Sequence, residues 1–242
     1  MKGVILAGGL GTRLNPLTKI TNKHLLPVYN KPMIYYSIEM FVKAGIRDIL
    51  VVTGGKNAGD FLRLLRNGKQ FGLKKLDYAY QEGEGGIADA LKLAGDFAGK
   101  QKIAVALADN IVEKSIKKFV NDFKKQKSGA KILLTPVKNP EEYGVAEFKG
   151  KKIARIREKP KKPATNLAVT GIYFYPPDVF GIAEKLRPSK RGELEITDVN
   201  NAYLKKGKLK YDILDGWWID CGESKDALLE ANLRVKKYGA NK

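Results

Sequence analysis

Cysteine is almost absent: Cys221 is the only one among 242 residues, which excludes an intramolecular disulfide. A chain of this length buries enough surface without such a cross-link, so we expect a cytoplasmic protein with one thiol. Long apolar runs are also missing. No stretch approaches the roughly 20 residues of a transmembrane helix, and the run from Val4 to Ala7 is too short for the apolar region of a signal peptide.

Long blocks of one charge are missing as well, although the net formal charge is +19, from 45 Lys and Arg against 26 Asp and Glu. The lysines recur as short pairs along the whole chain. Most pairs fall on expected helix faces or turns, where lysine is usually solvated. This distribution argues against nucleic acid as a partner, while a positive field would still draw in polyanionic substrates.

The first 135 residues alternate between strand-like and helix-like segments with short connections. Apolar runs predict buried strands at 2–7 and 48–53, and further strands are expected at 76–80, 102–108 and 131–135. Helical spacing of apolar residues predicts helices at 32–44, 60–66, 86–94 and 115–126. Such alternation predicts an α/β fold with a doubly wound, mostly parallel, Rossmann-like mixed sheet.

After Pro136 the pattern changes to shorter segments joined by glycine and proline turns. Strands are expected at 145–148, 152–157 and 170–175, which indicates a smaller antiparallel extension beside the first sheet. The remaining elements expected are helices at 178–186 and 196–205, a strand at 210–214 and a closing helix at 224–238. Ser224 is a plausible N-cap of that last helix. With no internal repeat or low-complexity linker, we predict a single domain, 1–242, in two parts that meet near residue 135.

A glycine turn follows the first strand. Gly8, Gly9 and Gly11 would let the backbone turn sharply and bring its N–H groups close to phosphate oxygens. The turn lacks the Gly-Lys-Ser/Thr of a Walker A loop and the third glycine of a dinucleotide fingerprint, so a plain structural turn is an equal alternative.

Arg13 and Lys23 come next, and together they could neutralise a triphosphate from two sides. Ordinary surface charge is the alternative for each of them.

Two aspartates follow apolar segments. Asp109 ends the predicted strand 102–108, and Asp220 follows Trp217-Trp218-Ile219. Ligand sites of open α/β sheets gather at such strand ends, and Mg²⁺ is bound by few carboxylates together with phosphate oxygens. The two residues could converge on one ion, although either could instead cap a turn.

Read together, these segments resemble the glucose-1-phosphate thymidylyltransferases, within the sugar-phosphate nucleotidyltransferases. The resemblance covers nearly the whole chain and keeps the family's order. The matching segments are GVILAGGLGTRLNPLT, KHLLPVYNKPMIYYSIEM, ALADN, EEYGVAEF, REKP, AVTGIYFY, RGELEITDVN and WWIDCGES. It implies an enzyme of dTDP-sugar biosynthesis that joins a sugar 1-phosphate, with glucose 1-phosphate favoured, to a nucleoside triphosphate, with dTTP favoured, and releases pyrophosphate.

The resemblance also implies a role for each matching residue. Arg13 and Lys23 would be catalytic, stabilising charge at the α-phosphate and the departing pyrophosphate, and Asp109 and Asp220 would bind Mg²⁺. The nucleotide would be held by Gly8, Gly9, Gly11, Thr12, Gln81 and Gly86. The sugar phosphate would be held by Tyr143, Gly144, Glu158, Lys159, Val169, Thr170, Arg191 and Trp218. Residues 1–135 would thus form the nucleotide-binding part, and 136–242 the sugar-binding part and closing helices.

Some features depart from the family pattern. Gln81 is followed by Glu82-Gly83-Glu84-Gly85-Gly86 where relatives commonly have a proline, so UTP or CTP remains an alternative to dTTP. His24 stands where many relatives have glutamine, and we expect it to have a pocket-wall or structural role. The chain ends near Lys242, whereas longer bacterial relatives continue with further helices. We therefore expect a short form without their regulatory nucleotide site. The sequence leaves open whether the protein forms a homo-oligomer.

Two other classes of function make different predictions for this sequence. A non-catalytic nucleotide-sugar-binding protein would lack one of the cations or carboxylates, yet Arg13, Lys23, Asp109 and Asp220 are all present. A nucleic-acid-binding protein would show one continuous basic patch and strongly salt-dependent binding. The expected partners are therefore the two substrates, with no nucleic acid and no membrane.

Overall fold

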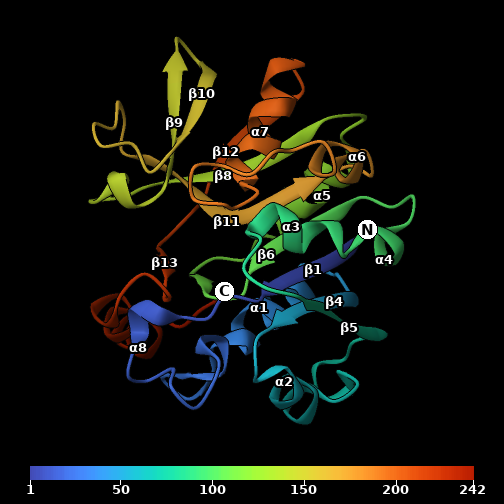
Figure 1. Ribbon diagram of the computed structural model, residues 1–242, viewed down its shortest axis with the longest axis vertical. Coiled ribbons are helices and arrows are strands. Elements are labelled where there is room, and N and C mark those ends of the chain that lie inside the picture. Colours follow the sequence, from blue (N-terminus) through green and yellow to red (C-terminus); the bar gives the residue numbers. More distant parts are fainter.

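The structure is a computed structural model that describes residues 1–242, and its centre is a nine-stranded mixed sheet (Figure 1). Four parallel strands form one side of the sheet, in the order β6–β1–β4–β5. They are β1 (Lys2–Ala7), β4 (Asp48–Gly54), β5 (Lys75–Gln81) and β6 (Ile103–Leu107). All four were predicted from the sequence, and the predicted α/β fold class is confirmed.

The other side of the sheet is mostly antiparallel and contains the predicted extension. Its strands are β8 (Ala130–Pro136), β9 (Gly144–Lys149), β10 (Lys152–Glu158), β11 (Leu167–Tyr175) and β12 (Leu209–Ile213). The hairpin β9–β10 is the extension proper, and it stands out at the top of Figure 1.

Strand β11 connects the predicted antiparallel extension to the parallel strands within one sheet. It pairs antiparallel with β6 through residues 172–175, and with β8 through residues 167–169 and 173–174. Its nine residues are almost all buried, so it fits the interior of the sheet rather than an edge. Through β11, the two parts of the chain share one sheet.

Helices cover both faces of this sheet, which explains why β1 reads as a continuous apolar run. Ile5 and Ala7 face one core, whereas Val4 and Leu6 face another. The first core is closed by α1 (Met33–Lys43), α2 (Ala58–Leu65) and α5 (Lys117–Lys125). The second is closed by α3 (Ile87–Lys92), α4 (Gly95–Ala98), α6 (Val179–Ala183) and α7 (Ile196–Lys205).

A small third core forms where distant parts of the chain meet. Strands β7 (Asn110–Val112) and β13 (Trp218–Asp220) pair antiparallel, and β2 (Pro27–Val28) pairs with β3 (Lys31–Pro32). The last helix, α8 (Lys225–Tyr238), packs on them. The hydroxyl of Ser224 accepts a hydrogen bond from the N–H of Ala227, so the predicted N-cap is confirmed. None of the helices combines the length and apolarity needed to cross a bilayer.

Candidate active site

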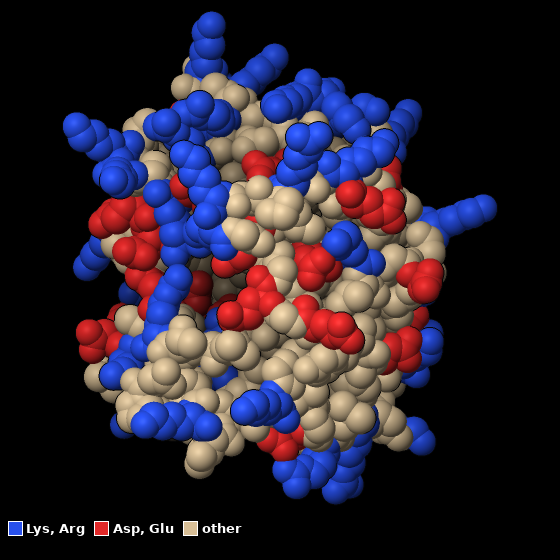
Figure 2. Space-filling view, viewed as in Figure 1, with Lys and Arg blue, Asp and Glu red and all other residues tan.

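A cleft opens at the carboxyl ends of β1 and β6, formed by two adjoining cavities of about 380 and 260 Å³. The cavities share seven lining residues: Gly9, Lys23, Glu84, Ile87, Leu107, Glu193 and Asp220. The space-filling view shows a hollow left of centre with acidic and basic side chains around it (Figure 2). Charge of both signs in one hollow suits a charged substrate together with a metal cation.

The glycine turn forms the floor of the cleft. Gly11 has a φ of 68°, a left-handed conformation that glycine adopts without a steric penalty. At Gly8 the constraint is space, because a Cβ there would lie 2.7 Å from the side-chain oxygen of Gln81. Glycine is therefore favoured at both positions of the turn. Arg13 follows in a short 3-10 helix, Thr12–Leu14, and is exposed at the rim with no carboxylate within ion-pairing distance.

The two predicted metal ligands, Asp109 and Asp220, lie together. Asp109 follows β6, and the pairing of β13 with β7 sets Asp220 opposite Asn110. The N–H of Cys221 then donates to the carbonyl of Asp109 at 2.9 Å. A Cβ at Gly222 would lie 2.5 Å from a carboxylate oxygen of Asp109 and 2.7 Å from the ammonium of Lys23, so a larger residue there would displace this ion pair. Within the motif WWIDCGES, the Cys-Gly pair is thus the part that packs against Asp109.

The charges in this region are strongly coupled. Lys23 forms an ion pair with Asp109, and both side chains are largely buried. Burial opposes the charge on Asp109, yet the ammonium of Lys23 and the imidazole of His24 hold its pKa below the usual range. Burial, and then the nearby charge of Asp109, raise the pKa of Asp220 to about 7. Lys23 therefore neutralises the charge of Asp109, whereas Asp220 forms no ion pair in the protein.

A divalent cation fits this arrangement. No group of three or more His, Cys, Asp or Glu side chains forms a complete metal cage in the protein. Two buried carboxylates beside an open cavity suit Mg²⁺, which binds one or two carboxylates and takes its remaining ligands from phosphates and water. The raised pKa of Asp220 agrees with this, because a bound cation would offset both the burial and the charge of Asp109 that raise it.

His24 lines the smaller cavity and is only 2% exposed. Its Nδ1 lies 2.8 Å from the side-chain oxygen of Asn22, and its Nε2 lies 3.8 Å from Asp109. Burial lowers its pKa, which favours the neutral imidazole. The expected pocket-wall or structural role agrees with this position.

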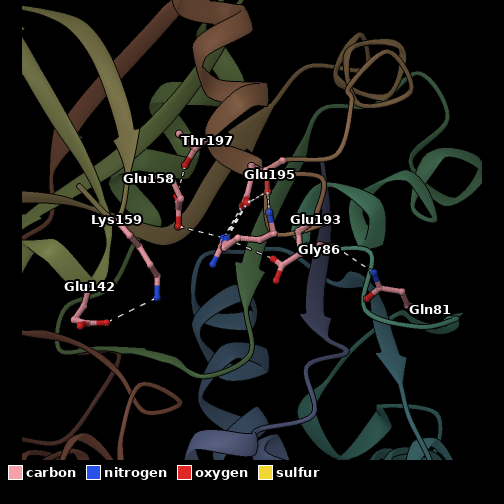
Figure 3. Close-up of polar contacts among 10 residues, drawn as sticks. Gln81, Gly86, Glu142, Glu158, Lys159, Glu193, Glu195 and Thr197 are labelled. Atoms are coloured by element: carbon pink, nitrogen blue, oxygen red, sulfur yellow. Dashed lines mark hydrogen bonds and ion pairs between the residues drawn. The ribbon is translucent and has the colours of Figure 1, made fainter. Parts of the chain in front are cut away.

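Carboxylates gather around Arg191 on the opposite wall. Its guanidinium contacts Glu195 at 2.8 Å and lies 3.7 Å from both Glu158 and Glu193. Glu158 in turn accepts a hydrogen bond of 2.6 Å from the hydroxyl of Thr197. Figure 3 shows Glu158, Glu193 and Glu195 converging on one region from β10 and the segment before α7. Arg191 is thus held in the cleft by carboxylates.

Lys159 lines the same cleft, and Figure 3 shows its side chain extending towards Glu142. It has a φ of 40°, which is rare and strained for a residue with a side chain. The hydrogen bond from its N–H to the carbonyl of Tyr143 stabilises this conformation. Its ammonium lies 3.9 Å from Glu142, and burial, followed by the charge of Arg13, lowers its pKa.

Both predicted metal ligands, and all but one of the other predicted site residues, line the cleft. Gly9, Gly11, Thr12, Arg13, Lys23, Tyr143, Gly144, Glu158, Lys159, Val169, Arg191 and Trp218 line the larger cavity, and Gly8, Gln81 and Gly86 the smaller. Thr170 is the exception. Its hydroxyl is fully buried and donates to the carbonyl of Leu133, because alternate residues of β11 face opposite sides of the sheet.

Sequence reasoning missed several lining residues, of which Asn110 is the best connected. Its side-chain oxygen accepts hydrogen bonds from the N–H of Gly171 at 2.8 Å and the indole of Trp218 at 2.7 Å. Its amide nitrogen donates to Asp109 at 3.0 Å. Its place next to Asp109 in the motif ALADN was the available signal. Glu223 was also missed; it accepts hydrogen bonds from Asn139 and Tyr143 across the cleft.

Comparison with known proteins agrees with this geometry. Residues 2–238 match the nucleotidyl transferase family. The chain belongs to that family. It is 45% identical over 226 residues to the glucose-1-phosphate thymidylyltransferase of Neisseria meningitidis, covering 92% of this chain and 78% of that protein. The family resemblance of the sequence is thereby confirmed, and the chain is a nucleotidyltransferase.

Solved structures of other nucleotidyltransferases have the same fold. A Bacillus anthracis protein, provisionally assigned as a glucose-1-phosphate thymidylyltransferase and crystallised with sucrose, superposes with a TM-score of 0.93 at 48% identity. That match covers 98% of this chain and 96% of the other. A UDP-glucose pyrophosphorylase in complex with UDP-glucose superposes with a TM-score of 0.84 at 27% identity, covering 98% of both chains.

Proposed function

We propose that this protein joins glucose 1-phosphate to dTTP, giving dTDP-glucose and pyrophosphate. The observation that carries the proposal is the convergence of Arg13, Lys23, Asp109 and Asp220 on one cleft, although they come from both ends of the chain. The similarity to thymidylyltransferases over most of the chain supports the choice of substrates. We further propose that residues 1–242 act as one unit, because residues from both predicted parts line the same cleft.

The smaller cavity suits the nucleotide. Gly8, Gln81 and Gly86 line it beside the carboxylates, so the base would lie near Gln81 and the phosphates near the glycine turn. Arg13 is exposed at the rim of the cleft, where its guanidinium is free to contact phosphate oxygens. Lys23 lies between the turn and Asp109, close to where the α-phosphate would be.

The larger cavity suits the sugar phosphate. Arg191 and Lys159 supply positive charge there, while Glu158, Glu195 and Thr197 supply acceptors for sugar hydroxyls. Val169 and Trp218 add apolar surface for a pyranose ring. Thr170 has no direct role in this proposal, since its side chain lies behind β11.

In the proposed reaction, a phosphate oxygen of the sugar 1-phosphate attacks the α-phosphorus in line. The bond from the α-phosphorus to the bridging oxygen breaks on the opposite side, and pyrophosphate leaves. No base is required, because the nucleophile is already an anion. Arg13 and Lys23 stabilise charge that builds up on the phosphoryl oxygens. Mg²⁺ held by Asp109 and Asp220 would neutralise further charge on the phosphates.

Pyrophosphate release provides the direct test. The purified protein is incubated with Mg²⁺, glucose 1-phosphate and each of dTTP, UTP, CTP and ATP, and then with other sugar phosphates. We expect the highest kcat/KM with glucose 1-phosphate and dTTP. Equal rates with all pairs would contradict the proposed specificity, and no release with any pair would contradict the reaction.

UTP is the second candidate nucleotide. The fold similarity to a protein in complex with UDP-glucose favours it, and the loop Glu82–Gly86 lacks the proline common in thymidylyltransferases. The 5-methyl group is the only difference between thymine and uracil, so competition between dTTP and dUTP isolates its contribution. Tighter binding of dUTP would favour the uridylyl reaction.

A further inference from the structure

Asp89 lies outside the cleft but directly behind the predicted base-binding residue Gln81. The amide nitrogen of Gln81 donates to a carboxylate oxygen of Asp89 at 3.0 Å and to the backbone carbonyl of Gly86 at 3.1 Å. Figure 3 shows the contact between Gln81 and Gly86 at the edge of the cleft. Asp89 is absent from the cavity lining, so any effect it has on the nucleotide must pass through Gln81.

These two partners fix which way the Gln81 amide faces. A carboxylate and a carbonyl are both acceptors only, so both require the NH₂ group. The opposite orientation would set the Gln81 oxygen against two other oxygens. Oε1 is therefore directed away from Asp89, over the glycine turn, where a Cβ at Gly8 would be 2.7 Å from it. No protein donor bonds to Oε1, which leaves it as an acceptor for a ligand in the smaller cavity.

Asp89 is itself well held in its charged form. Lys92 contacts its other carboxylate oxygen at 2.8 Å, and Asp89 lies in the first turn of α3, where negative charge is favoured. Partial burial opposes the charge, but the hydrogen bonds from Lys92 and Gln81 outweigh it and lower the pKa of Asp89. At neutral pH the carboxylate can only accept, so it cannot support the inverted amide.

We propose that Asp89 is a positioning residue for base selection: it holds the Gln81 amide nitrogen, so that Oε1 meets a donor at N3 of the base. Uracil and thymine carry an N–H at N3, whereas cytosine carries a lone pair there. The fixed oxygen therefore selects uracil-type and thymine-type bases against cytosine. This inference rests on the proposed function, because it places the base of the nucleotide in the smaller cavity.

The first test compares dUTP and dCTP, which differ only at positions 3 and 4 of the base. Their dissociation constants are measured by calorimetry with Mg²⁺ for the wild-type protein, Asp89→Ala and Asp89→Asn. We expect the wild type to bind dUTP more tightly than dCTP. In both variants the ratio of the two dissociation constants should fall roughly tenfold, which is the effect of one mispaired hydrogen bond. The asparagine of the second variant offers an NH₂ group to Oε1 and so permits the inverted amide, without a change of shape.

Asp60→Asn is the matched control. Asp60 also lies in the first turn of a helix, accepts from a side-chain amide, that of Asn57, and pairs with a basic residue three positions on, Arg63. It has no contact with Gln81. We expect the control to keep the dUTP preference of the wild type. A change in the control equal to that of Asp89→Asn would overturn the inference, as would an unchanged preference in both Asp89 variants.

The second test observes the proposed hydrogen bond itself. With dUTP labelled with ¹⁵N at N3, the complex should show an imino proton resonance that exchanges slowly with water, and Asp89→Ala should speed that exchange. Absence of the resonance, or tighter binding of dCTP by the wild type, would overturn the inference while pyrophosphate release from dTTP and dUTP continued. If no triphosphate is used at all, the proposed function fails as well, which distinguishes the two failures.

Discussion

Asp220 lies directly opposite Asn110 in the pairing of β13 with β7, and this register places its carboxyl group beside that of Asp109. The contact joins residues more than a hundred positions apart in the chain. The backbone of Asp109 is held by its hydrogen bond from Cys221, and that of Asp220 by the pairing of β13 with β7, so replacing either carboxylate leaves these backbone contacts in place.

We expect Asp109→Asn and Asp220→Asn each to lower kcat by roughly a hundredfold or more, because each removes a charge from the proposed metal site. Circular dichroism should show an unchanged fold. Asp215→Asn, an exposed aspartate paired with Lys118, is the control and should keep full activity. Near-normal Mg²⁺-dependent activity in both site variants would contradict the metal assignment.

The stability of the metal-free protein should fall as pH rises towards neutrality. An unfolded aspartate titrates near pH 4, whereas burial and the charge of Asp109 raise the pKa of Asp220 to about 7. Between these values the folded state binds more protons than the unfolded state, so the free energy of unfolding decreases with pH. Asp109 has the opposite shift and contributes only at lower pH.

Asp220→Asn tests this pH dependence, because asparagine does not titrate. Tm measured without metal between about pH 5 and pH 8 should decline less in the variant than in the wild type. Mg²⁺ with nucleotide should raise the Tm of the wild type most at the upper end of this range. Parallel Tm curves for the two proteins would contradict the raised pKa.

Arg13 should matter for turnover and not for stability. It is exposed and forms no ion pair, so Arg13→Ala should leave Tm nearly unchanged. Loss of one charge-stabilising group should lower kcat by roughly a hundredfold, and Arg13→Lys should recover part of it. The measurement is kcat and KM for the triphosphate. A large fall in Tm, or an unchanged kcat, would argue for a structural role.

Asn110→Ala should be strongly destabilising. Its side-chain oxygen serves two buried donors, Gly171 N–H and the Trp218 indole, and its removal leaves both without a partner. Each buried donor left unsatisfied costs about 1–3 kcal/mol, so for two donors we expect a loss of roughly 2–6 kcal/mol in the free energy of unfolding by urea denaturation. Trp218→Phe removes only one of the two contacts and should cost less. An equal loss in both variants would contradict this account.

Much of the fold could be predicted because its strands carry strong local signals. β1 and β4 are buried on both faces and therefore consist almost entirely of apolar residues. The closing helix also began where Ser224 indicated. In contrast, β7 and β13 have three residues each, too few for a periodic pattern, and their pairing depends on contacts between distant segments. β11 was predicted as a strand, but its neighbours could not be read from its own residues.

The candidate site was predicted in the same uneven way. Charged residues in recognisable segments, such as Arg13 and Asp109, lie in the cleft as the resemblance implied. Thr170 was included because its neighbours lie in the same motif, yet strand alternation turns its side chain away. Asn110 stood next to Asp109 in the motif ALADN but was not chosen. Asp89 lies outside the cavity lining and contacts Gln81 and Lys92, which no residue-type pattern indicates.

The pairing of β13 with β7 also sets the order in which the cleft can be completed during synthesis. The sheet is complete once β12 has emerged from the ribosome, because its ninth strand ends at Ile213. The second carboxylate comes afterwards, at Asp220. A nascent chain halted between these two points can hold every strand of the sheet and still lack half of its acidic pair, so completing the sheet does not by itself complete the proposed metal site.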